Sequence, residues 1–202
     1  MAGAGDEDRT LHARHAVAAD LDRLTATLAA AFGNDPLWTW AFPGGEKLDA
    51  WWRFLVQSAL RYRSVWVAGD HEAVSVWIPP GGSELTDAEE ERVEPLLQEL
   101  LGSRAPQVMQ LLERFEESHP TGTPHYYLSL FGTHPAHRGH GIGMRLLAEN
   151  LARIDDEAMP AYLESSNPAN DRRYERVGFE RLGSFSTPDG SHAVSMMWRE
   201  PR

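Results

Sequence analysis

A run of three glycines between an apolar stretch and an amphipathic stretch is the first place where this sequence could bind a ligand. Residues 138–143 read Arg-Gly-His-Gly-Ile-Gly and follow the uncharged block 126–133 and the break at His134-Pro135. Glycine permits a tight turn and lets a ligand approach bare backbone N–H groups. A helix that begins after such a turn offers unpaired N–H groups and the positive end of its dipole, which favour an anion such as phosphate.

The glycine run taken alone also fits a tight strand-to-helix connection that binds nothing. Two known phosphate loops are excluded. The Gly-Lys-Ser/Thr ending of a nucleoside-triphosphate loop is missing, and the third glycine of the dinucleotide fingerprint is absent at its spacing. What remains is Arg-x-x-Gly-x-Gly, directly after a strand that ends in Thr-x-Pro at residues 133–135.

A second motif lies further along the chain, where residues 167–179 carry the spacing Asn…Tyr-Glu-x-x-Gly-Phe. The two motifs, in this order and separation, resemble the signature of the GNAT family of N-acetyltransferases. Shorter stretches resemble the branch of that family that acetylates puromycin; they lie at residues 27–32, 65–68, 73–77, 102–104 and 160–166.

The resemblance implies a single GNAT domain over residues 1–202, with a mixed, mostly antiparallel sheet flanked by helices and splayed central strands. It implies transfer of an acetyl group from acetyl-CoA, without a metal, to a small-molecule amine such as an aminonucleoside antibiotic. Two other functions stay open: a non-catalytic CoA-binding accessory or regulatory protein, and a protein or peptide N-acetyltransferase.

The same resemblance assigns cofactor contacts. The central strand would lend its backbone to the pantetheine arm, the N–H groups of the glycine turn would hold the pyrophosphate, and the second motif would contact the arm near the sulfur. Two side chains also have structural interpretations, since Arg138 could form an ion pair and Asn167 could cap a helix. The implied cofactor-binding residues are Phe131, Gly132, Thr133, Arg138, Gly139, His140, Gly141, Ile142, Gly143, Asn167, Asn170 and Tyr174.

Two side chains are candidates for proton transfer. Tyr174 matches the family tyrosine near the sulfur, where a phenol can donate a proton to the departing thiolate; the alternative is a core tyrosine. Many family members carry a glutamate early in the central strand, but Tyr127 stands there. Glu164, in an otherwise apolar stretch, is the nearest candidate base, and burial would raise its pKa. It could instead be a structural hydrogen-bond anchor, or the enzyme could rely on a water chain or an already neutral amine.

Aromatic residues gather between residues 38 and 54, and most of them are expected in the core. Trp38, Trp40 and Tyr127 are the candidates for lining an acceptor pocket, since large rings suit an apolar or aromatic ligand. His134, His137 and His140 surround the glycine turn, but no carboxylate accompanies them with metal-ligand spacing. We therefore expect no metal.

The composition fits one domain, with 202 residues of which 42% are hydrophobic. No cysteine is present, which removes disulfides and a cysteine nucleophile and fits a cytoplasmic protein. The formal net charge of −11 argues against nucleic acid; it can attract a cationic amine or simply favour solubility. We expect a disordered lead-in at residues 1–9, no membrane contact, and a monomer or homodimer.

These residues need a scaffold, and the hydrophobic periodicity predicts one. Helices are expected at residues 20–32 and 48–63, a hairpin at 64–78, and a helical insert at 83–120 that starts with a capping box at Thr86 and Glu89. The central strand at 126–133 leads through the glycine turn into a helix at 144–157. A strand at 161–164, a helix at 168–177 and a final hairpin at 179–198 complete the order, after a first strand at 11–17.

Overall fold

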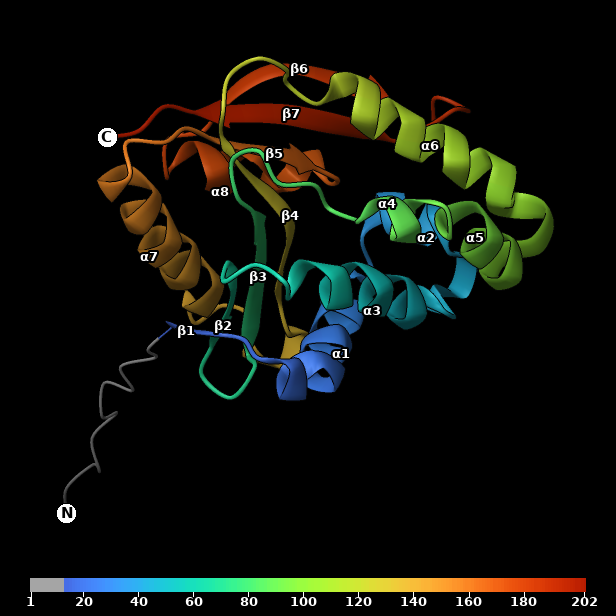
Figure 1. Cartoon of the computed structure of the whole chain (residues 1–202), viewed down its shortest axis with the longest axis horizontal. Coiled ribbons are helices and arrows are strands. Elements are labelled where there is room, and N and C mark those ends of the chain that lie inside the picture. The colour runs from blue at the N-terminus through green and yellow to red at the C-terminus, as the bar shows by residue number, and fades with distance from the viewer. Residues whose placement is uncertain (1–12) are drawn as a thin grey trace.

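The computed structural model describes residues 13–202, so the predicted disordered lead-in and the start of the first predicted strand lie outside the described residues. The described strands form one seven-stranded sheet in the order β1-β2-β3-β4-β5-β7-β6 (Figure 1). Their bounds are β1 Ala13–His15, β2 Val65–Ala68, β3 Ala73–Ile78, β4 Tyr126–Thr133, β5 Ala161–Ser165, β6 Glu180–Ser186 and β7 Ala193–Arg199. Within the described sheet only the β4–β5 pair is parallel, which confirms the predicted mixed, mostly antiparallel fold class.

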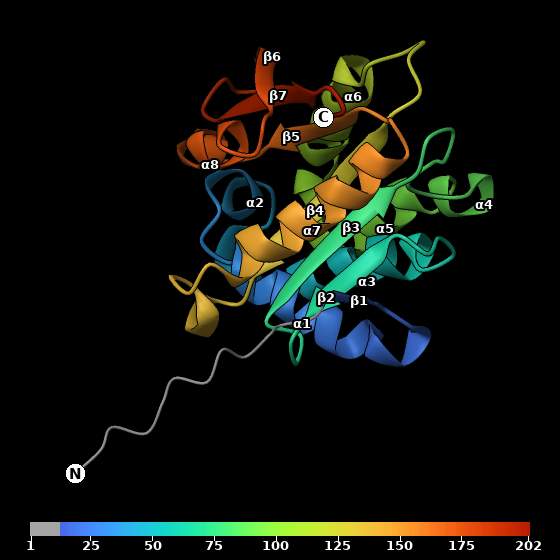
Figure 2. The ribbon, with the colours of Figure 1, turned by 90° about the vertical axis from the view of Figure 1, so that its left-hand side faces the viewer.

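Helices cover both faces of the sheet, as Figures 1 and 2 show. Helices α1 and α3 pack on one face, and α7 packs on the other. The α-helices are α1 Leu21–Phe32, α2 Pro36–Ala41, α3 Leu48–Ala59, α4 Asp87–Glu90, α5 Val93–Leu101, α6 Ala105–Ser118, α7 Ile142–Asp156 and α8 Asp171–Glu175. Short 3₁₀ helices are η1 Ala18–Asp20, η2 Pro43–Gly45, η3 Gly102–Arg104, η4 Pro135–His137 and η5 Pro168–Asn170. Among residues 13–202 none of the helices has the length and apolar character that a membrane crossing requires.

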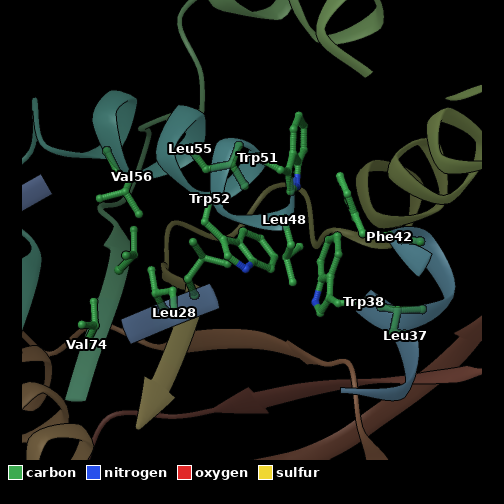
Figure 3. Close-up of a cluster of buried hydrophobic side chains, with 14 of the residues drawn as sticks. Leu28, Leu37, Trp38, Phe42, Leu48, Trp51, Trp52, Leu55, Val56 and Val74 are labelled. Carbon is green, nitrogen blue, oxygen red and sulfur yellow. The ribbon is translucent and has the colours of Figure 1, made fainter. Parts of the chain in front are cut away.

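The larger core cluster fills the space between α1, α3 and the sheet. Trp51, Trp52 and Phe42 are almost fully buried there, and Figure 3 shows Trp52 beside Leu28 of α1. The smaller cluster lies under α7, where Asn150 accepts hydrogen bonds from Ser75 and Trp77 of β3. These polar contacts fix α7 on the sheet, because a buried amide without partners would destabilise the fold.

Helix α2 was not expected from the sequence. The prediction placed helices at residues 20–32 and 48–63 and assigned none to the residues between them. In the structure Asp35 is an N-cap, and its carboxylate accepts from the N–H groups of Leu37 and Trp38 at 3.0 and 3.2 Å. Pro36 occupies the first helical position, where its missing N–H costs nothing.

The helical insert closes the open side of the sheet. Its predicted capping box is present, since Thr86 and Glu89 bond reciprocally at the start of α4. Helix α6 then crosses toward the last hairpin, where Arg114 donates to the carbonyl oxygens of Ser186 and Thr187. The ring of Phe115 packs edge-on against Phe185 at 5.0 Å. The insert therefore forms a wall above the sheet.

The two central strands separate partway along their length. β4 and β5 pair only at three positions, from Tyr126 with Ala161 to Leu128 with Leu163. The β3–β4 register also shifts at this point, where Trp77 faces Leu128 and Val76 faces Leu130, so Ser129 is the extra residue of a β-bulge. Beyond Leu128 the edge of β4 that faces β5 has no strand partner. This confirms the predicted splay of the central strands.

Candidate active site

A cavity of about 1400 Å³ opens where β4 and β5 separate. One end is formed by the glycine turn, the start of α7 and Tyr174 of α8. The other end is formed by the aromatic side chains of α2, α3 and α6. Both ends belong to one cavity, so a bulky carrier at one end and an acceptor molecule at the other could be bound together.

The glycine turn leaves its backbone open to the cavity. Gly139 and Gly141 have φ values of 85° and 73°, and no heavy atom lies within 3.8 Å of the place where a Cβ would sit on either residue. Gly141 is the N-cap of the 15-residue helix α7, and no side chain caps this end. The first N–H groups of α7 are therefore bare. A phosphate or pyrophosphate group fits this cradle, as the sequence predicted for a helix N-terminus.

Gly143 and Gly132 are glycines for a packing reason. A Cβ on Gly143 would collide with the Thr133 hydroxyl, so the start of α7 can sit directly against the end of β4. A Cβ on Gly132 would lie 2.8 Å from the Cβ of Ala31, so this glycine lets α1 approach β4. Both residues line the cavity with their backbone.

The other predicted cofactor residues lie around the same end of the cavity, apart from His140. Arg138 donates from its guanidinium to the carbonyl oxygens of Ala31 and Thr133 at 2.6 and 3.3 Å, so its side chain joins α1 to β4. Asn167 caps η5 through Ala169, and Asn170 accepts from Arg173. Cavity-lining residues of the prediction are Phe131, Gly132, Thr133, Arg138, Gly139, Gly141, Ile142, Gly143, Asn167, Asn170 and Tyr174. His140 is exposed on the turn and does not belong to the lining.

Tyr174 lies where α8 meets the open edge of β4. Its ring centroid is 6.4 Å from that of Phe131 and 6.1 Å from that of Phe179. Burial raises the pKa of the Tyr174 phenol well above its ordinary value, and the charges of Asp35 and Asp171 raise it further. The phenol therefore stays protonated at neutral pH, which is the state that a general acid requires.

Glu164 points into the cavity from the end of β5. Its side chain is 1% exposed, and neither carboxylate oxygen has a hydrogen-bond partner among residues 13–202. Burial raises the pKa of Glu164 to about 8, although the nearby Tyr162 and Tyr127 hydroxyls act in the opposite direction. A carboxylate without partners is a poor structural anchor, so the geometry favours the interpretation of Glu164 as a base.

Glu84 is a cavity residue that the sequence did not reveal. The prediction placed it in the helical insert at residues 83–120 and gave it no role in the site. In the structure it precedes α4 and accepts a hydrogen bond from Ser129 at the bulge of β4. Burial raises the pKa of the Glu84 carboxyl. A carboxylate therefore does reach the central strand, but the helical insert supplies it.

Two of the three predicted acceptor residues line the cavity, and the third does not. Trp38 and Tyr127 line the cavity, and the Trp38 ring packs edge-on against Trp52 at 4.6 Å. Trp40 points elsewhere: its indole N–H donates to Asp189 at 2.8 Å, and the Arg104 guanidinium lies 4.8 Å from its ring. Trp40 is not among the lining residues, because alternate positions on the short helix α2 face different sides.

The histidines near the turn do not assemble a metal site. Within the described part of the chain no group of three or more His, Asp and Glu side chains is arranged to hold a metal ion. His137 instead faces Glu72 with its Nδ1 3.5 Å from the carboxylate.

Two comparisons match part of the chain to known acetyltransferases. Residues 116–200 match the model of the acetyltransferase (GNAT) domain family. A curated acetyltransferase of Agrobacterium fabrum is 35% identical over 81 residues, which are 38% of this chain, and the chain spans 55% of that relative's length.

Similarity to solved structures covers nearly the whole chain. The histone acetyltransferase HPA2 and related acetyltransferase from Corynebacterium glutamicum is 26% identical, with a TM-score of 0.71 over 95% of this chain and 97% of that chain. A polyamine N-acetyltransferase of Drosophila melanogaster has the same fold at 18% identity, with a TM-score of 0.67 over 94% of this chain and 99% of that chain. The part of the chain that the structure describes therefore has the GNAT fold, and residues 116–200 match the GNAT acetyltransferase domain.

Proposed function

We propose that this protein is an N-acetyltransferase that moves an acetyl group from acetyl-CoA to the amine of a small cationic molecule. The observation that carries the proposal is the single cavity that joins the bare glycine turn to Tyr174 and Glu164. The first element suits a phosphate-bearing carrier, and the other two suit the two proton transfers that acyl transfer to an amine requires.

Acetyl-CoA supplies an activated acetyl thioester when it is bound. In this proposal the N–H groups of residues 139–143 hold its pyrophosphate, and the unpaired backbone edge of Phe131 and Thr133 holds its pantetheine arm. Asn167 and Asn170 line the same stretch of the cavity. Arg138 contributes positive charge near the turn, although two backbone carbonyls occupy its side chain.

Two side chains then each carry out one proton transfer. Glu164 takes a proton from the substrate ammonium, because only a neutral amine can attack the carbonyl carbon. Tyr174 donates its phenol proton to the departing thiolate. A backbone N–H on the free edge of β4 can stabilise the developing oxyanion. The enclosed cavity holds the amine close to the thioester and so removes much of the entropic barrier.

The lining of the acceptor end supports a cationic amine with an apolar or aromatic body. Trp38 and Phe115 provide apolar surface, while Glu113 and Glu116 provide negative charge. The similar fly enzyme is named for polyamines. An aminonucleoside antibiotic such as puromycin, which has an aromatic body and an amine, stays a candidate substrate in this proposal.

A turnover screen tests the function. The purified protein is incubated with acetyl-CoA and, separately, with puromycin, aminoglycosides, polyamines and amino acids, while release of free CoA is followed. We expect CoA release with at least one cationic amine. Tight binding of acetyl-CoA without CoA release from any amine would contradict catalysis and favour an accessory CoA-binding protein.

A further inference from the structure

The loop between α6 and β4 brings two histidines to the wall of the cavity beside Glu164. The Nδ1 atom of His119 lies 3.9 Å from Oε1 of Glu164. The Nε2 atom of His119 lies 3.1 Å from Nε2 of His125. The His119 ring packs edge-on against the rings of Tyr127 and Tyr162, at 4.9 and 5.1 Å, so its orientation is fixed. The proposed chemistry described so far uses neither histidine.

The hydrogen bonds of this pair determine where each ring carries its proton. The carbonyl oxygen of Thr123 lies 2.7 Å from Nδ1 of His125 and can only accept, so Nδ1 of His125 carries the proton. A neutral imidazole has one N–H, which leaves Nε2 of His125 bare. Nε2 of His119 must therefore donate to it, and Nδ1 of His119 is bare.

Resting on the proposed function, we propose that Thr123, His125 and His119 form a tautomer lock, which presents a bare nitrogen to Glu164 and keeps its carboxylate free to take a proton from the amine. An N–H in that place would face the carboxylate from 3.9 Å, and its positive end would stabilise the charged form and make Glu164 a weaker base.

The electrostatic surroundings support the lock. Burial lowers the pKa of His119 to about 4, so the ring stays neutral near neutral pH and does not become a donor at both nitrogens. Glu164 is faced by Tyr127 from β4, by Tyr162 from its own strand and by Glu84 from the segment before α4. These groups are unchanged in the variants below, so they affect each variant equally.

The first test reads the tautomers directly and does not need activity. Two-dimensional ¹⁵N NMR of the histidine side chains, on the full-length protein at neutral pH, distinguishes a proton on Nδ1 from one on Nε2. We expect His119 to carry its proton on Nε2 and His125 on Nδ1. A proton on Nδ1 of His119 would overturn the proposal.

The second test uses the pH dependence of kcat/KM with one amine. His125→Phe keeps a ring against Tyr162 and Trp198 but removes the nitrogen that accepts from His119. His119 is then free to adopt the other tautomer and donate to Glu164. We expect the ascending limb of the profile to move to lower pH by about one pH unit, because a donor stabilises the charged carboxylate.

The double variant His119→Phe/His125→Phe provides the decisive control. It also removes the His119 N–H, so the ascending limb of the kcat/KM profile should return to its wild-type pH even though both histidines are lost. His192→Phe, in the β6–β7 hairpin and outside the cavity, controls for general effects of losing a histidine. The proposal is overturned if the ascending limb of His125→Phe lies at the wild-type pH. It is also overturned if the limb stays displaced in the double variant. If the wild type turns over no amine, the proposed function fails, and the NMR measurement still decides the lock.

Discussion

Burial acts on Glu164 and Tyr174 in the same direction, yet the proposed function gives them opposite tasks. Burial raises the pKa of Glu164 to about 8, which brings the basicity of this carboxylate closer to that of an amine. It raises the pKa of Tyr174 above its ordinary value, so the phenol is protonated at neutral pH. In the proposed function, desolvation therefore prepares one group as the base and the other as the acid.

The first prediction concerns the pH profile of Glu164→Gln. A base must be ionised to accept a proton, so wild-type kcat/KM should rise as pH increases through about 8. The glutamine has nearly the same shape but does not titrate. Its profile should lose that ascending limb and fall by roughly a hundredfold at the plateau. If Glu164→Gln keeps the ascending limb, another group must be responsible for it.

The second prediction concerns the stability of the same variant. The carboxyl holds its proton more strongly in the folded state than in the unfolded state, where its pKa is about 4.3. Between that value and about 8 the folded state binds more protons, so wild-type stability should fall by roughly 1.4 kcal/mol per pH unit. Glu164→Gln should lack this contribution, and its melting temperature should exceed that of the wild type more at pH 8 than at pH 5. An equal difference at both pH values would contradict the raised pKa.

The third prediction concerns Tyr174→Phe, which removes only the hydroxyl. If the phenol protonates the thiolate, kcat should fall by roughly a hundredfold, with little change in the KM for acetyl-CoA. If Tyr174 is only a core residue, the variant should lose about 1 kcal/mol of stability and turn over almost normally. Steady-state rates and a thermal melt of the same preparation separate these outcomes.

At the scale of the elements, the junction of β4, the glycine turn and α7 forms the proposed cofactor end of the cavity. Gly141 has a φ of 73° and a free space where a side chain would project. Gly190, in the turn of the last hairpin, has the same φ of 73° and equally free surroundings outside the cavity. The two glycines therefore place the same strain on a substituted side chain, and only one of them borders the proposed phosphate cradle.

The fourth prediction uses this matched pair. Gly141→Val should abolish acetyl-CoA binding in calorimetric titration, because the new side chain occupies the place of a phosphate. Gly190→Val should lose a similar amount of stability, of order 1–2 kcal/mol, and bind acetyl-CoA normally. Unchanged affinity in a folded Gly141→Val would remove the turn from the cofactor site.

Elements with a strong local pattern could be predicted from the sequence, and the long-range contacts could not. The capping box at Thr86 and Glu89 and the β4–turn–α7 unit follow from neighbouring residues. Helix α2 could not be predicted, because a proline such as Pro36 can either end a helix or start one. In the structure the N-cap by Asp35 makes Pro36 the first residue of α2. Trp40 was placed in the pocket on residue type alone, whereas its contact with Asp189 joins positions far apart in the chain.

The same limit applies to the site. Tyr174 and the glycine turn belong to spaced motifs, so the sequence could single them out. Glu84 looked like one of several acidic helix residues, and only the folding of the insert over β4 brings it to Ser129. The position of His119 beside Glu164, with His125 beside His119, likewise requires α6 to end beside β5. Tertiary contacts of this kind leave no local pattern in the sequence.

At the scale of the whole molecule, the fold divides the cavity by charge. The proposed cofactor end has bare N–H groups and Arg138, while the proposed acceptor end has the carboxylates of Glu113 and Glu116. The formal net charge of −11 adds negative potential around the molecule. In the proposed function this arrangement favours the approach of a cationic amine to the acceptor end.

Mass spectrometry of the acceptor amine tests the central claim most directly. The wild-type protein is incubated with acetyl-CoA and the most active cationic amine of the turnover screen, with Gly141→Val and Gly190→Val in parallel. We expect an amine that is heavier by one acetyl group, in equal amount to the CoA released, for the wild type and Gly190→Val but not for Gly141→Val. An unmodified amine in the presence of wild-type protein that binds acetyl-CoA would contradict acetyl transfer as the function of this site.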